Sequence, residues 1–233
     1  MIRWQIPGYE VAFTTRVGGV SEGPYASLNL GRKSGDDVKR VDANRRIACD
    51  AIGADLDELA LNYQVHSARV LKAAPRMRGE RADGLWTDEP GLPIVAMSAD
   101  CLPIAIARAD GPEPAVCVLH AGWRGLLAGI VEAGAGALGD EPLPAAIGPG
   151  IGPCCYEVGE EVAAPYRERF GEDVVRHGHL DLWTSAERAL RQAGIEHVHR
   201  FDRCTACEPE TFFSHRRDRG ITGRQGVIAY VTG

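Results

Sequence analysis

The sequence predicts a single α/β domain, of the α+β kind, in which helices cover large mixed β-sheets. Short apolar runs bounded by turn residues recur along the 233 residues, and stretches of helical periodicity lie between them. No segment is rich enough in Ser, Gly or Pro to act as a flexible linker. Residues 1–233 are therefore expected to fold as one domain.

The apolar runs have the length and composition of buried strands. They predict strands at residues 11–15, 68–72, 94–97, 103–107, 115–119, 195–201 and 227–231. Helices and strands follow one another irregularly, which favours mixed sheets over a regular alternation of parallel strands.

Helical periodicity is clearest over residues 37–52, where apolar side chains recur on one face from Val38 to Ile52 and Gly53 ends the helix. A further helix is expected to begin at Thr184, because Thr-Ser-Ala-Glu is a capping box that satisfies free backbone donors. The remaining predicted helices are at residues 126–138 and 158–170.

The charge pattern argues against two classes of partner, nucleic acids and membranes. The net charge is −6, and no run of Lys and Arg is longer than two, so nothing attracts a phosphate backbone or an anionic lipid surface. The most apolar stretch, residues 125–139, contains Glu132 and is shorter than the roughly 20 residues that span a bilayer. A soluble protein that binds neither nucleic acid nor a membrane is therefore expected.

Cysteine usage indicates the compartment. The chain has seven cysteines, an odd number, and residues 1–13 lack the apolar core of a secretory signal. Free thiols in a reducing environment are therefore expected, and the predicted location is the cytoplasm.

Three residues form a candidate metal site. His66 follows the segment Leu-Asn-Tyr-Gln-Val, Cys101 lies between two apolar runs, and His120 ends the predicted strand 115–119. Side chains at strand ends can meet at one rim of a sheet, and two imidazoles with one thiolate suit zinc. The gaps match no compact zinc signature, so two hydrogen-bonded histidines and a buried thiol remain the alternative.

Two further patterns are weaker. Cys204 and Cys207 form a CxxC motif, which is typical of redox or zinc chemistry. No second CxxC completes a set of four, although Cys154 and Cys155 are adjacent to each other in the sequence. Two unpaired thiols in a loop are therefore expected. The HxH pairs at 177–179 and 197–199 resemble copper ligands, but no cysteine and methionine accompany them as in a blue-copper centre, which favours surface histidines.

The glycine-rich segment 147–153 is expected to be a rigid turn, since Pro149 and Pro153 remove amide donors that a phosphate loop uses. Arg16, Arg124 and Arg224 each lie beside glycines. A guanidinium in such a position can bind phosphate with two hydrogen bonds, although a surface ion pair is the commoner role.

Twelve short segments together resemble one family. They are TTR at 14–16, GGVS at 18–21, SLNLG at 27–31, DD at 36–37, NR at 44–45, QVH at 64–66, ADG at 82–84, SADCLP at 98–103, HAGWRG at 120–125, IGP at 147–149, GPCCYEV at 152–158 and FSHRR at 213–217. In this order the chain is similar to the laccase-domain family, first described as polyphenol oxidases and later as purine nucleoside phosphorylases. The resemblance runs from about residue 12 to residue 228, and Cys207 and the HxH pairs have no counterpart in the pattern.

The resemblance implies a Zn²⁺ ion bound by His66, Cys101 and His120, within a single α/β unit. It also implies phosphorolysis of adenosine, inosine and methylthioadenosine to the free base and the sugar 1-phosphate, and hydrolytic deamination of adenosine to inosine. Three protein ligands leave one tetrahedral position open, as a catalytic zinc site requires. The implied partners are purine nucleosides and phosphate.

Five other residues are assigned hypothetical roles from their position and charge. Arg16 and Arg124 are assigned to phosphate, and Asp83 or Asp100 to orientation or proton transfer. Cys154 is assigned to the substrate pocket, with packing of a turn as the alternative.

Three other functions stay open at this point. A copper-dependent polyphenol oxidase would use copper in place of zinc. A cysteine hydrolase would use Cys101 or Cys154 as nucleophile with His66 or His120 as base. A binding module with a closed structural zinc site would need a fourth protein ligand.

Overall fold

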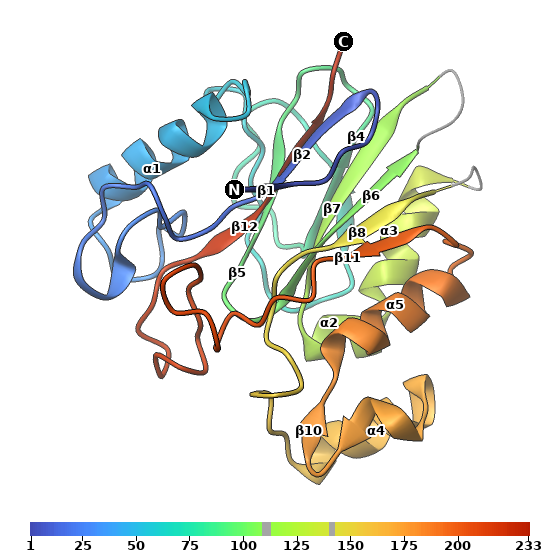
Figure 1. Ribbon diagram of the computed structural model, residues 1–233. Helices are drawn as coiled ribbons and strands as arrows, with labels where there is room; N and C mark the ends of the chain where they lie inside the picture. The colour runs from blue at the N-terminus through green and yellow to red at the C-terminus, as the bar shows by residue number, and fades with distance from the viewer. Residues whose placement is uncertain (109–112, 140–142) are drawn as a thin grey trace.

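Two β-sheets lie face to face at the centre of the computed structural model, which describes residues 1–108, 113–139 and 143–233 (Figure 1). The antiparallel four-stranded sheet has the order β1 (Ile2–Arg3), β2 (Tyr9–Phe13), β12 (Gln225–Val231), β5 (Ile94–Ser98). The six-stranded sheet has the order β11 (Val198–Arg200), β8 (Ala145–Ile147), β6 (Leu102–Arg108), β7 (Ala115–Ala121), β4 (Gly84–Thr87), β3 (Val70–Lys72). This sheet is mixed, because its two outermost pairs are parallel and its inner pairs antiparallel.

The strict alternation of strand side chains explains why both sheets are buried on two faces. In β12, Val227 and Ala229 point into the core between the sheets, whereas Ile228 points to the opposite face. In β7, Val116 and Val118 face the same inter-sheet core. Both faces of each sheet therefore need apolar side chains, which is why these strands appear in the sequence as continuous apolar runs.

Helices cover the outer faces and make the molecule four layers deep (Figure 1). Helix α1 (Val38–Asp50) packs on the four-stranded sheet. On the six-stranded sheet lie α2 (Trp123–Ala128), α3 (Ile130–Leu138) and α5 (Leu182–Gln192), with α4 (Glu160–Phe170) against α2 and α5. The short elements are η1 (Gly23–Tyr25), η2 (Glu172–Val174) and the hairpin β9 (Val175–Arg176) and β10 (His179–Leu180).

The predicted fold class is confirmed, and every predicted strand has an observed counterpart. Residues 126–138 are not one helix: Gly129 adopts a left-handed conformation, with φ of 90°, and separates α2 from α3. The capping box at Thr184 is also wrong, because α5 begins at Leu182 and its cap is Asp181, whose side chain accepts from the Thr184 amide. Five strands were not predicted from the sequence, β1, β4, β8, β9 and β10, and they have only two to four residues each.

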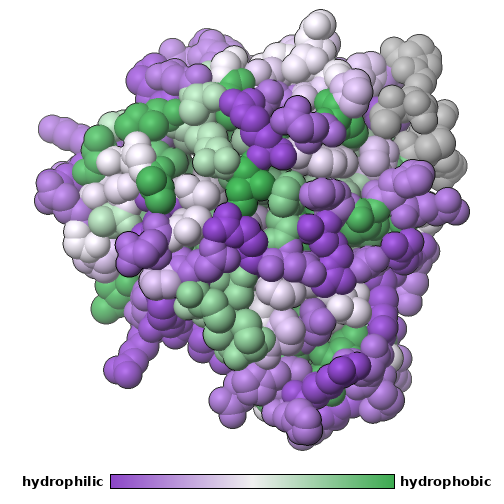
Figure 2. Space-filling model, in the orientation of Figure 1, coloured by the Kyte–Doolittle hydropathy of each residue, from purple (hydrophilic) through white to green (hydrophobic). Residues whose placement is uncertain are grey.

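The surface seen in Figure 2 carries small, separate hydrophobic patches among hydrophilic residues. Among the described residues, the large apolar side chains that are exposed are those of Met1, Val17, Val20, Val38, Tyr63 and Ile221. Within the described part of the chain, no helix combines the length and the apolar character that crossing a bilayer requires.

Candidate metal centre

His66, Cys101 and His120 meet at one end of the two sheets. One ligand atom from each lies within 4.8 Å of the others. His120 is the second-last residue of β7, and its side chain lies on the same face as those of Val116 and Val118. Its paired residue on β6 is Pro103. Cys101 immediately precedes β6, and His66 comes from the loop before β3. The sheet therefore brings together three residues that are far apart in sequence, as the positions at strand ends predict.

The buried carboxylate of Asp83 holds two of the three side chains in place. Its Oδ1 lies 2.9 Å from Nδ1 of His120, which fixes that ring nitrogen as the donor and leaves Nε2 free for a metal. The same carboxylate accepts from the backbone amides of His66, at 2.9 Å, and Ser67, at 2.7 Å. Asp83 thus orients one ligand directly and the other through its backbone.

The loop that carries His66 has an unusual backbone. His66 has a φ of 61°, in the left-handed region that non-glycine residues rarely occupy. Amides of residues 65–67 converge on the Asp83 carboxylate, and the Ser67 hydroxyl donates to it at 2.7 Å. These hydrogen bonds offset the cost of the conformation, so Asp83 and the loop form one unit.

Electrostatics favour a thiolate at Cys101. Burial raises its pKa, but the charge and hydrogen bonds of His120 and His66 outweigh burial and lower the pKa of Cys101 to about 6. For His120, burial lowers the pKa, whereas the Cys101 thiolate and the Asp83 carboxylate raise it to about 9. Burial also raises the pKa of Asp83, but hydrogen bonds from His120 and Ser67 bring it well below its usual range. The surroundings therefore favour the thiolate of Cys101, which is the form that binds metal.

The residues present fit a zinc-type ion. Two imidazoles and a thiolate form a donor set of borderline softness, which suits zinc. The ring nitrogen of His120 that faces away from the site is held by the Asp83 carboxylate, as is usual for metal-bound histidine. Gly122 leaves room for the ligands: a Cβ at this position would lie 2.8 Å from Cys101 Sγ and 3.1 Å from His66 Cδ2. No fourth His, Cys, Asp or Glu joins this group among the described residues.

A cavity of about 640 Å³ opens onto the three ligands. Its size is that of a pocket for a small molecule. Its walls include the ends of β5 and β7, the residue before β12, and segments 31–34 and 215–216. Aromatic side chains that can pack against a planar base line it as well, at Trp123 and Tyr156.

Several cations of the cavity wall have no carboxylate partner. They are Lys33, Arg45, Arg78, Arg216 and Arg224. Of the salt bridges formed by the described residues, the only one that involves a Lys or Arg of this wall is that of Arg32 with Asp42. Burial lowers the pKa of Arg45 to about 10 and lowers that of Arg224 as well. Arg45 and Arg224 are half-buried, whereas Lys33, Arg78 and Arg216 are exposed. Half-buried cations without a counter-charge are costly unless an anion joins them, so Arg45 and Arg224 suit the cavity to an anionic ligand.

The structure does not bring Arg16, Arg124 and Cys154 to this cavity. Arg16 donates to the carbonyls of Ala26 and Pro209, at 2.6 and 2.8 Å, and thereby joins two loops. Arg124 is exposed and its guanidinium lies 4.2 Å from the Trp123 ring. None of the three is among the residues that line the cavity.

Asp100 lines the cavity, and its carboxylate joins two neighbouring segments. It accepts from the Thr205 hydroxyl at 2.6 Å and from the Arg216 amide at 2.7 Å. These bonds fix the backbone just before Cys101, which suits the orienting role. Each carboxylate oxygen keeps a further acceptor site, so proton transfer stays an open alternative.

The two thiols of the CxxC motif are unpaired, as expected, but they do not lie alone. Cys207 Sγ lies 3.5 Å from Cys154 Sγ and 3.4 Å from Cys155 Sγ, and Cys204 belongs to the same cluster. The HxH histidines join neither of the two candidate metal groups in the described residues. His179 instead hydrogen-bonds the Pro153 carbonyl, at 2.8 Å.

Sequence reasoning singled out neither Arg45 nor Lys33, and it noted Arg224 without assigning it to the anion. Arg45 is in the segment NR at 44–45, on α1, which gave a signal only as part of the family pattern. That these cations lack carboxylate partners follows from tertiary contacts, which spacing along the chain does not reveal.

Comparison with known proteins places these features in a family. The model of "Multi-copper polyphenol oxidoreductase laccase" matches residues 10–232. A purine nucleoside phosphorylase, YfiH, of Shigella flexneri is 38% identical over 98% of this chain and 97% of its own. One of Deinococcus radiodurans is 40% identical over 93% of this chain and 87% of its own. The crystal structure of YlmD from Geobacillus stearothermophilus superposes with a TM-score of 0.90 at 34% identity, covering 98% of this chain and 93% of that one. The chain therefore belongs to the laccase-domain family.

Proposed function

We propose that this chain is a zinc-dependent purine nucleoside phosphorylase of the cytoplasm. It would convert adenosine, inosine and methylthioadenosine, with phosphate, to the free base and the sugar 1-phosphate, and would also deaminate adenosine. The observation that carries the proposal is one cavity in which cations without carboxylate partners adjoin a His2Cys ligand set. The names of relatives that match over nearly the whole chain support it.

Phosphorolysis forms a bond from a phosphate oxygen to the anomeric carbon of the ribose. It breaks the bond from that carbon to the purine nitrogen, whose electron pair leaves with the base. The chain's own residues contribute mainly by position: Arg45 and Arg224 would hold the phosphate, and Tyr156 and Trp123 would pack against the base. When bound by His66, Cys101 and His120, zinc would supply a Lewis acid with one position not taken by protein.

The direct test incubates metal-analysed protein with adenosine, with and without phosphate, and identifies the products by chromatography. Adenine with ribose 1-phosphate, formed only when phosphate is present, is the expected result. Inosine formed without phosphate would support the deaminase part. If neither product appears with metal-loaded protein, the proposed function is overturned.

Replacing Arg224 with alanine is expected to weaken phosphate binding selectively. Arg224 lines the cavity, where burial lowers its pKa and the nearby charge of Cys101 acts in the opposite direction. It has no carboxylate partner among the described residues. Losing a charge-assisted hydrogen bond costs about 1.5–3 kcal/mol, or roughly 10- to 100-fold in the KM for phosphate. Steady-state kinetics at varied phosphate measures this, and the KM for the nucleoside should change much less.

Arg124→Ala in the same assay decides between two locations for the anion. If phosphate is bound in the cavity, this exposed residue on α2 should leave the KM for phosphate within about twofold. If the KM for phosphate rises strongly in Arg124→Ala and stays normal in Arg224→Ala, the phosphate binds at the N-terminal end of α2 and not in the cavity.

The lowered pKa of Cys101 beside His120 also fits a second function, that of a cysteine hydrolase. In that case alkylation of Cys101 would abolish activity in metal-free protein, whereas a phosphorylase that depends on zinc would already be inactive there. Oxygen uptake that follows copper content and ignores phosphate would instead indicate a polyphenol oxidase.

A further inference from the structure

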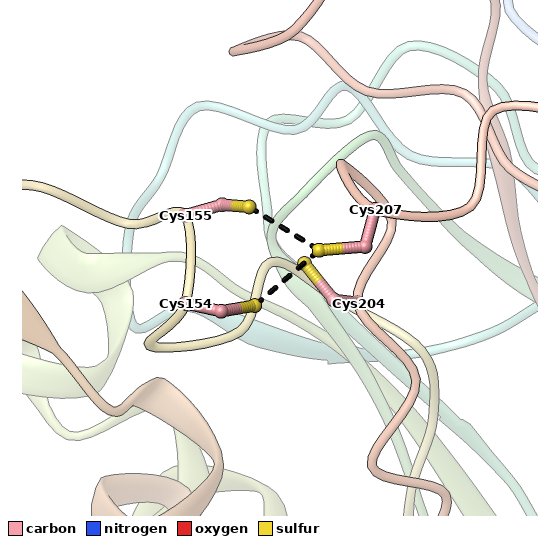
Figure 3. A group of neighbouring side chains, drawn as sticks. All are labelled: Cys154, Cys155, Cys204 and Cys207. Atoms are coloured by element: carbon pink, nitrogen blue, oxygen red, sulfur yellow. Dashed lines mark hydrogen bonds between the residues drawn. The ribbon is translucent and has the colours of Figure 1, made fainter.

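The second group of candidate metal ligands consists of four cysteines and lies outside the cavity. Cys154 and Cys155 come from the turn after β8, and Cys204 and Cys207 from the turn after β11 (Figure 3). All four Sγ atoms are within 4.8 Å of one another, and all four cysteines are free thiols. Figure 3 shows the two pairs of side chains pointing toward each other across the gap between the two segments.

The spacing of these atoms fits a tetrahedral metal site. A zinc–sulfur bond is about 2.3 Å long, so four thiolates around one ion are separated by about 3.8 Å. The distances of 3.5 Å from Cys154 to Cys207 and 3.4 Å from Cys155 to Cys207 are close to this value. They are far longer than the roughly 2.05 Å of a disulfide bond.

The surroundings of Cys204 suit a thiolate ligand. The amide of Gly152 donates to Cys204 Sγ at 3.3 Å, and such a hydrogen bond stabilises negative charge on a metal-bound sulfur. Between the two cysteines of the CxxC motif the chain makes a tight turn, in which the Cys207 amide donates to the Cys204 carbonyl at 3.2 Å. The turn presents both sulfurs to the same side.

We propose that Cys154, Cys155, Cys204 and Cys207 bind a second zinc ion in a closed tetrathiolate site. Four protein ligands complete the coordination of zinc and leave no position for water, so the site is structural. An all-sulfur donor set also selects zinc over magnesium or calcium, which prefer oxygen. This site is independent of the proposed function and does not need the His66 centre to be occupied.

The site would fasten together two segments that form part of the cavity wall. Gly150 and Cys204 already form a β-bridge, and the Thr205 amide donates to the Gly150 carbonyl at 3.1 Å. Thr205 in turn holds Asp100, next to Cys101. Tyr156, which lines the cavity, directly follows Cys155, and the amide of Arg216, another lining residue, donates to the same Asp100. Zinc at the cysteine cluster would therefore stabilise the wall without contacting a substrate.

The first test measures the zinc content of the purified full-length chain by mass spectrometry of the elements. The Cys154→Ser/Cys207→Ser variant is expected to hold one equivalent of zinc less than the wild type. Cys49→Ala is the matched control, because Cys49 is a buried cysteine outside both clusters and its loss should leave the zinc content unchanged. Equal zinc in the wild type and the double variant would overturn the proposal, as would a disulfide among the four cysteines in unreduced protein.

A second test keeps all four cysteines and so does not depend on the folding of a cysteine variant. In His66→Ala/His120→Ala, the first centre loses two ligands, and the remaining zinc should show only sulfur neighbours by X-ray absorption, four at about 2.3 Å. Nitrogen or oxygen neighbours, or a complete absence of zinc from this variant, would contradict the tetrathiolate site. If the zinc in this variant has four sulfur neighbours while the wild type shows no phosphorolysis, the tetrathiolate site stands and the proposed phosphorylase function fails.

Discussion

Gly122→Ala is expected to remove metal binding and activity while leaving the fold intact. The added methyl group would lie 2.8 Å from Cys101 Sγ and 3.1 Å from His66 Cδ2, so both ligands would have to move. A misplacement of about 1 Å can cost about 100-fold in rate, and loss of ligand orientation costs about 10- to 100-fold in metal affinity. Because both ligands would shift, we expect zinc affinity, measured by competition with a chelator, to fall by about 100-fold, and the rate of phosphorolysis by a similar factor.

The backbone at Gly122 does not itself require glycine, which makes the experiment specific. Its φ of −81° is open to any residue, and alanine at the start of α2 costs at most about 1 kcal/mol of stability. Gly136→Ala is the matched control: this glycine is exposed in α3, and its Cβ would meet no atom within 4 Å. It should keep normal zinc affinity and unfold at the same or a slightly higher temperature. Normal zinc affinity in Gly122→Ala would mean that the three residues are not packed as ligands of one ion.

The parts of the fold that could be predicted are those that repeat a local pattern. The apolar run 115–119 predicts β7 because every residue of a central strand between two cores must be apolar. The pattern fails at Gly129, because apolar residues continue through it, and only the left-handed backbone shows that one helix ends and another begins. β4 escaped prediction because its four residues are too few to show a period.

The candidate site likewise has parts that the sequence predicts and parts that it does not. His120 and Cys101 flank predicted strands, so their proximity follows from the pairing of β6 with β7. Position and charge suggested Asp83 for orientation or proton transfer, but its partners could not be predicted, since they are amides of residues 65–67 and a ring 37 residues further along the chain. The four cysteines illustrate the limit most clearly: β8 and β11 are neighbours in one sheet, and this places a CC pair against a CxxC pair that no spacing rule connects.

Asp83→Asn is expected to lower the metal affinity of the centre, because Asp83 holds both His66 and His120 in position. The carboxylate of Asp83 acts only as an acceptor, from amides of the 65–67 loop, the Ser67 hydroxyl and His120 Nδ1. An asparagine would turn one of its oxygens into a donor that faces other donors. Loss of such a partner typically costs 10- to 100-fold in metal affinity, and an unsatisfied buried group costs about 1–3 kcal/mol of stability.

Two measurements separate these effects. Zinc affinity, from competition with a chelator, should fall by about 10- to 100-fold, and thermal unfolding of metal-free protein should show the smaller loss of stability. Asp88→Asn is the control from the other end of β4: its carboxylate is at the surface, 2.7 Å from Lys72, and such a pair contributes at most about 1 kcal/mol. Ser67→Ala should lie between the two, because it removes one of the hydrogen bonds to Asp83 and leaves His120 oriented. If Asp83→Asn lowers stability but keeps wild-type zinc affinity, Asp83 supports the loop and does not orient the metal ligands.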